Sequence, residues 1–286
     1  MAKKSSLRRH YTAAQLHALE KVQREIHAAD PHLRRKYLRE FSNAFRTYES
    51  VLSPADLTAT YQASDVLLVG DYHSLPASQD FAAELVRHVA QLGREVILGL
   101  EFVFACDQQA LELWYAGRIS GSELRDRIRF DSEWGYDWRP FYRLLQAGRE
   151  CAQRIVALDC MPRNDISRIA ARDRHAAAML AQVRQQNPGA VVIALFGESH
   201  LAPNHLPELL RRLRPQDRTV TVLQNIDPLY WRASREGSEH AEGVGVSDNV
   251  VCVFNSTPLE KYESYRLCIE RWQQGQARPR NRRRTA

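Results

Sequence analysis

The sequence lacks the features that mark several large protein classes. No segment approaches the roughly 18 consecutive apolar residues of a membrane-spanning helix, so we predict no membrane span. The basic N-terminal residues are not followed by the apolar stretch that a secretory leader needs, and we therefore expect a cytoplasmic protein. Glycine-rich phosphate-binding loops are absent as well.

Cysteine is scarce and irregularly spaced. The chain holds 5 cysteines, an odd number, and no two of them have Cys-x-x-Cys spacing. This pattern indicates neither a disulfide framework nor a structural zinc site. Cys252 lies inside the apolar run 250–254, and we expect it to be a small buried hydrophobic residue.

The net charge of +6 comes from the two ends of the chain. Residues 1–9 and 271–286 carry ten basic residues and no acid, which leaves about −4 for the rest. A nucleic-acid-binding body would show a basic face of its own, so we expect no specific nucleic-acid partner. We predict basic disordered tails at 1–10 and 275–286 and a single α/β domain at 11–274. Loose attraction of the tails to RNA or a membrane surface is the alternative.

The middle of the chain alternates short apolar runs with helical patterns. Four runs are continuously apolar, which is typical of parallel strands covered on both faces. We predict an α/β fold with a mostly parallel sheet, helices on both of its faces and an N-terminal helical extension. The four runs are 66–69, 96–100, 155–158 and 191–195, with further strands at 220–223 and 250–254. The predicted helices between them are 75–92, 108–115, 138–152, 165–186 and 206–213.

Two other segments have recognisable local signals. Residues 12–48 carry apolar residues at helical spacing on both sides of a break at Asp30-Pro31, which predicts two helices. Ser53-Pro54 is typical of a helix start. The glycine-rich segment Arg235–Asp248 is interpreted as a loop.

Acids and histidines follow the four apolar runs. The first run ends in Gly70-Asp71-Tyr72-His73 and the last in Gly197-Glu198-Ser199-His200, so the same Gly-acid-x-His pattern occurs twice. Glu101 and Asp159 follow the other two. Ligands bind at the carboxyl ends of the strands in open α/β sheets. We therefore expect His73, Glu101 and His200 to converge in one cleft.

This convergence suits general acid–base chemistry or the binding of a cation. The structural alternatives are that Asp71 or Glu198 caps the next helix and that each histidine has only a structural role. Ser199 is a poor nucleophile candidate, because the second glycine of a Gly-x-Ser-x-Gly elbow is missing.

An aromatic cluster lies between the second and third runs. Such a cluster packs in a core or lines an apolar ligand pocket, and the sequence leaves both interpretations open. Its members are Trp134, Tyr136, Trp138, Phe141 and Tyr142.

The order of these motifs resembles the ChaN-like family, over about residues 45–225. That family is described as haem-binding and linked to iron uptake, and it shares a superfamily with the Tiki metalloproteases and the erythromycin esterases. The motifs that carry the resemblance are Gly70-Asp71-Tyr72-His73 with Gln79, Leu100-Glu101-Phe102 with Gln108, Trp134-Gly135-Tyr136-Asp137-Trp138 with Tyr142, Met161-Pro162-Arg163, and Gly197-Glu198-Ser199-His200.

The resemblance implies a polar pocket with His73, Glu101 and His200 at its centre, as the candidate catalytic residues. The same three, with Asp71 and Glu198 beside them, become candidate ligands of a divalent metal. The family usually carries glutamate where this chain has Asp71, one methylene shorter.

Two functions from different classes follow. The first is cytoplasmic binding of haem or a metal-containing ligand, which needs an apolar slot and an axial ligand. The second is a hydrolase of the Tiki and erythromycin esterase type, either metal-dependent or with histidine as general base. We expect a small-molecule or haem partner, with a homodimer as the candidate oligomer. Candidate cofactor-binding residues are Tyr72, Trp134, Tyr136, Trp138 and Tyr142, and candidate axial ligands are Tyr72, His73 and His200.

Overall fold

The structure is a computed structural model that describes residues 12–30, 36–161, 169–236 and 241–275. Within these residues, eight strands form one sheet in the order β1-β7-β8-β6-β2-β5-β3-β4. The strands are β1 (Ser50–Leu52), β2 (Val66–Asp71), β3 (Val96–Phe104), β4 (Arg154–Asp159), β5 (Val191–Gly197), β6 (Thr219–Gln224), β7 (Gly243–Ser247) and β8 (Val250–Val253).

The predicted parallel strands are confirmed. β2, β5, β3 and β4 are consecutive neighbours and all pair in parallel. β6 and β8 extend the parallel part on the other side of β2. Every residue of β2, β3 and β5 is buried, as expected for strands that are covered on both faces.

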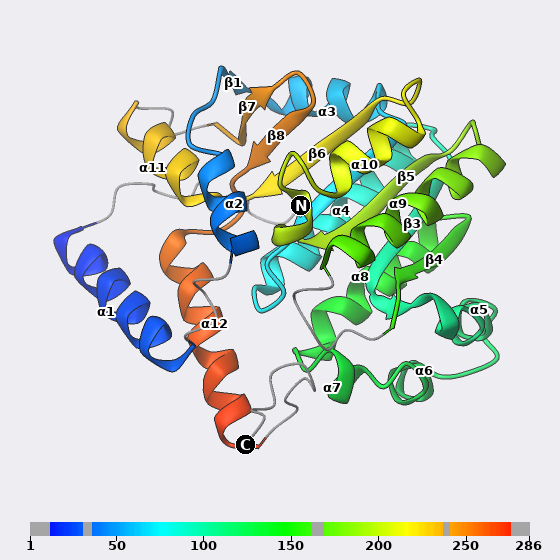
Figure 1. Cartoon of the computed structure of the whole chain (residues 1–286), viewed down its shortest axis with the longest axis horizontal. Coiled ribbons are helices and arrows are strands. Elements are labelled where there is room, and N and C mark those ends of the chain that lie inside the picture. The colour runs from blue at the N-terminus through cyan, green and yellow to red at the C-terminus, as the bar shows by residue number, and fades with distance from the viewer. Residues whose placement is uncertain (1–11, 31–35, 162–168, 237–240, 276–286) are drawn as a thin grey trace.

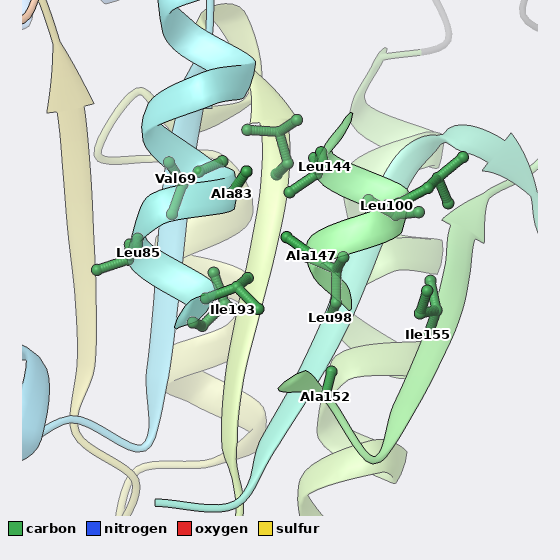
Figure 2. Close-up of a cluster of buried hydrophobic side chains, with 14 of the residues drawn as sticks. Val69, Ala83, Leu85, Leu98, Leu100, Leu144, Ala147, Ala152, Ile155 and Ile193 are labelled. Carbon is green, nitrogen blue, oxygen red and sulfur yellow. The ribbon is translucent and has the colours of Figure 1, made fainter. Parts of the chain in front are cut away.

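Helices cover the sheet on both sides, as predicted (Figure 1). One face carries α4 and α8, and Figure 2 shows their Ala83, Leu85, Leu144 and Ala147 in one cluster with buried residues of the strands. The helices are α1 (Ala13–Ala29), α2 (Lys36–Ala44), α3 (Pro54–Gln62), α4 (Pro76–Gln91), α5 (Gln108–Tyr115), α6 (Gly121–Arg127), α7 (Phe130–Glu133), α8 (Trp138–Cys151), α9 (Ile169–Gln186), α10 (Leu206–Leu213), α11 (Asp227–Arg235) and α12 (Pro258–Gln273).

The N-terminal helical extension is present and packs on the C-terminal helix. α1 and α12 lie side by side in Figure 1, and Val22 and Ile26 share a small core with Ile269. The helix start predicted at Ser53 is confirmed, because its side chain accepts a hydrogen bond from the Asp56 backbone N–H.

The loop predicted over Arg235–Asp248 is wrong for its second half, which forms β7 between β1 and β8. Glycine is tolerated in this strand because the backbone of the neighbouring strand β8 approaches it closely. A Cβ on Gly243 would lie 2.7 Å from the Cys252 carbonyl oxygen. Cys252 itself is fully buried, as expected.

The predicted tails, 1–10 and 275–286, lie outside the described residues except for Gly275. The disorder of these tails and the limits of the domain stay predictions. In the described part of the chain, no helix has the length and apolar character needed to cross a membrane.

Candidate functional site

The site is built where three adjacent strands end. Asp71, the last residue of β2, pairs with Gly197, the last of β5, and Leu100 of β3 pairs with Leu195. This register brings the segments that carry His73, Glu101 and His200 together. β3 differs from the prediction in continuing past Glu101 to Phe104, with a shift in its pairing to β4 after Leu100.

The Glu101 carboxylate is the hub of the site, and its side chain is only 4% exposed. One oxygen accepts from Arg172 at 2.5 Å and lies 3.1 Å from His200 Nε2. The other accepts from the Gly197 backbone N–H at 2.6 Å. Burial alone would raise the pKa of Glu101, but His200 and Arg172 outweigh it and hold the pKa well below its usual value.

Arg172 joins Glu101 to a second buried acid. Its guanidinium donates to both oxygens of Asp159, at 2.7 and 2.9 Å. Burial by itself lowers the pKa of Arg172, but the Asp159 and Glu101 carboxylates raise it above its usual value. The strand-end acid Asp159 is therefore neutralised by a fixed cation.

His200 is locked between two carboxylates. Its Nδ1 bonds to Asp173 of α9 and its Nε2 faces Glu101, with the side chain 3% exposed. Burial alone would lower the pKa of His200, but the Glu101 and Asp173 carboxylates together raise it to about 9. At neutral pH both ring nitrogens therefore carry protons, and neither has a lone pair for a base or a ligand.

His73 is the opposite case. Its Nδ1 lies 2.7 Å from an Asp71 oxygen, and the other Asp71 oxygen accepts from Gln79. Its Nε2 makes no hydrogen bond to any described residue, and its side chain is 22% exposed. A Cβ on Gly197 would lie 2.8 Å from that Nε2, so the imidazole lies directly against the glycine and a larger residue would collide with it.

The aromatic cluster divides into two parts. Trp134 and Tyr136 pack on the His73 ring, with centroids 4.5 and 5.2 Å away. Trp138 and Tyr142 stack on each other at 5.5 Å instead. They pack further against Phe130 and Trp114, in the core.

Tyr72 and Glu198 face α12 rather than the hub. The Lys261 ammonium lies 4.8 Å from the Tyr72 ring centroid and 3.7 Å from a Glu198 oxygen, and it donates to the Asn225 carbonyl at 3.1 Å. Burial raises the pKa of Tyr72 well above its usual value and also raises that of Glu198.

The helix-capping interpretation of Asp71 is wrong. The N-cap of α4 is Leu75, which makes no side-chain capping bond. Asp71 instead bonds to His73 and to Gln79 of the first turns of α4. Gln108, the other glutamine of the motifs, bonds to the backbone of β4 at Ile155 and Ala157.

The divalent-metal expectation for His73, Glu101, His200, Asp71 and Glu198 finds no support. Among the described residues, no group of three His, Cys, Asp or Glu side chains is arranged to hold a metal ion. The reason is that Arg172, His200 and Gly197 already occupy the Glu101 oxygens.

Sequence reasoning missed Arg172, Asp173 and Lys261. Arg172 and Asp173 lie on α9 and Lys261 on α12, where charged residues usually face solvent. No local signal separates them from such residues. Arg163, which the motif resemblance included, lies outside the described residues.

A family model described as "Haem-binding uptake, Tiki superfamily, ChaN" matches residues 57–191. The resemblance predicted from the strand-end motifs is thereby confirmed. No curated protein matches the chain.

Two solved structures are similar to this chain. One is ChaN of Campylobacter jejuni, reported with cofacial haem binding, at 12% identity and a TM-score of 0.46, covering 61% of this chain and 86% of that chain. The other is the type III effector HopBA1, at 10% identity and a TM-score of 0.51, covering 75% of this chain and 99% of that chain. At such low identity, the likeness to HopBA1 establishes the fold and says nothing about activity.

Proposed function

We propose that this chain, which resembles the ChaN family of haem-binding uptake proteins, binds haem with His73 as the axial ligand. The observation that supports this most is the Asp71–His73 pair. It leaves Nε2 without a hydrogen bond among the described residues and beside two aromatic rings.

The residues around His73 fit such a ligand. A carboxylate that accepts the Nδ1 proton fixes the ring tautomer and makes Nε2 a stronger ligand. Gly197 lets the imidazole lie close to the end of β5, and Trp134 and Tyr136 offer apolar surface. A bound haem would supply an iron centre whose potential the axial ligand tunes.

The other two candidate axial ligands fit less well. Both His200 nitrogens bond or face carboxylates, and the Tyr72 ring lies against Lys261 and Tyr265. His73 is therefore the ligand to test first.

Haem titration of the full chain tests the proposal. We expect a Soret band that saturates at a defined stoichiometry, and His73→Ala to shift that band and weaken binding. His88→Ala is the matched control, because His88 is also half-buried but lies in the last turn of α4, bonded to Thr58. Equal binding by wild type and His73→Ala would refute the assignment.

A hydrolase with His73 as general base is the second candidate. The same Asp–His pair favours it, because an imidazole held by a carboxylate through Nδ1 can take a proton from water at Nε2. Ester or peptide turnover by the haem-free chain, lost in His73→Ala by roughly 10²–10⁴-fold, would favour this function over haem binding.

A cytoplasmic location and a homodimer stay predictions. Cell fractionation tests the first, and light scattering of the purified chain with and without haem tests the second. A dimer that forms only with haem would link oligomeric state to the ligand.

A further inference from the structure

The C-terminal helix α12 contacts both loops that surround His73. Trp272, near its end, packs edge-on against Tyr136 with ring centroids 5.4 Å apart. Tyr136 in turn packs on the His73 ring. A chain of two ring contacts therefore connects α12 with the imidazole.

Trp272 also bonds to the backbone of the loop that carries Tyr136. Its buried indole N–H donates to the Gly135 carbonyl at 2.8 Å. Gly135 has φ +74, in the left-handed region, so the loop turns sharply here. One side chain thus holds both the backbone turn and the ring that follows it.

The first half of α12 contacts the residues on either side of His73 in the chain. The Tyr265 and Tyr72 rings lie 6.1 Å apart, and the Ser264 and Ser74 hydroxyls lie 3.3 Å apart. α12 therefore holds the loop that carries His73 as well as the loop that covers it.

This helix is supported mainly by α1 rather than by the sheet. The Tyr265 hydroxyl donates to Asp30 at the end of α1, and Val22 and Ile26 pack against Ile269 and Trp272. The α1–α12 pair has its own small core, separate from the two cores that cover the sheet.

We propose that Trp272 is a positioning residue, which sets the orientation and exposure of His73 through Tyr136 and Gly135. For haem binding, the inference rests on the function proposed above. The inferred effect of Trp272 on the orientation and exposure of His73 does not depend on haem binding. Removing Trp272 frees Tyr136 and the Gly135 turn, so the imidazole becomes more accessible and less ordered.

Chemical modification of His73 tests this without any ligand. Diethyl pyrocarbonate reacts with unprotonated imidazole nitrogens, and mass spectrometry measures its rate at His73. We expect Trp272→Ala to raise that rate severalfold. Trp272→Phe, which keeps a ring against Tyr136 but cannot donate to Gly135, should fall between wild type and Trp272→Ala.

Trp114 provides the matched control. It is also a buried tryptophan, 1% exposed, but it packs on Tyr142 and Arg149. Trp114→Phe and Trp114→Ala should lower thermal stability and leave the His73 rate unchanged. All rates are compared well below the melting temperature of each variant.

Haem titration of the same variants gives the second readout. We expect Trp272→Ala to weaken haem binding about tenfold, or ~1.4 kcal/mol, with a changed Soret position. If wild type binds no haem, the proposed function fails and the modification rates still decide the role of Trp272. If Trp272→Ala changes stability alone, as Trp114→Ala does, the positioning role is refuted.

Discussion

The two Gly-acid-x-His segments end adjacent parallel strands, yet their histidines have opposite environments. His200 lies between two carboxylates and is 3% exposed, whereas His73 has one carboxylate partner and is 22% exposed. The first is a protonated part of a buried charge network, and the second keeps an available nitrogen. The same short motif therefore produces a buried, paired imidazole at one strand and a partly exposed imidazole at the next.

The largest expected effect is a difference in the free energy of unfolding between His200→Ala and His73→Ala. His200→Ala leaves Glu101 and Asp173 buried without their shared cation, and breaking a buried ion pair costs about 3–5 kcal/mol. His73→Ala should cost only about 1 kcal/mol, because the side chain is partly exposed. Urea unfolding of both variants measures this. Equal costs would show that both histidines are structural.

The pH dependence of stability should come from His200. Its folded pKa of about 9 lies above the unfolded value near 6.5, so its contribution is complete below the unfolded pKa and is lost as pH rises through about 9. The contribution is worth up to about 3 kcal/mol. The stability gap between wild type and His200→Gln should therefore narrow between about pH 6 and pH 10. A constant gap would contradict the assigned charge.

The two motif glycines should differ in how much a substitution by alanine costs. A Cβ on Gly197 would lie 2.8 Å from His73 Nε2, whereas one on Gly70 would meet its nearest neighbour, Leu201, at 3.5 Å. Gly197→Ala should cost about 1–3 kcal/mol by overpacking and displace His73, with loss of haem binding. Gly70→Ala should stay near wild type in thermal unfolding and haem titration, and similar losses in both would remove the distinction.

The smallest expected effect concerns Asp71. Asp71→Asn keeps the size of the side chain but removes the charge that holds the Nδ1 proton of His73. We expect a change in stability of about 1 kcal/mol or less and a weaker axial ligand, visible as a shifted Soret band. Asp137→Asn, at the half-buried N-cap of α8, is the control. An unchanged spectrum would mean that the carboxylate does not act on the imidazole.

Much of this architecture could be predicted from local sequence. The continuous apolar runs identified β2, β3, β4 and β5, because burial on both faces requires such runs. β7 was predicted as a loop because glycine is common in loops. The glycine at position 243 is explained instead by the close approach of β8, which cannot be predicted from local sequence.

The site itself was only half predictable. The strand ends gave His73, Glu101 and His200, because parallel strands end at one edge. The partners that set their charges, Arg172 and Asp173, come from a helix whose pattern gives no hint that they are buried. Which histidine would be locked and which left available therefore depended on tertiary contacts.

The strand order also has a consequence for synthesis of the chain. β2, β3 and β4 are synthesised before β5, yet β5 lies between β2 and β3 in the sheet. In a nascent chain that ends at residue 191, where the family match ends, β5 is missing. The edges of β2 and β3 that pair with β5 are then unpaired. Glu101 and Asp173 are synthesised before His200. The charge network that these three residues share can therefore form only after the helices up to α9 have been made.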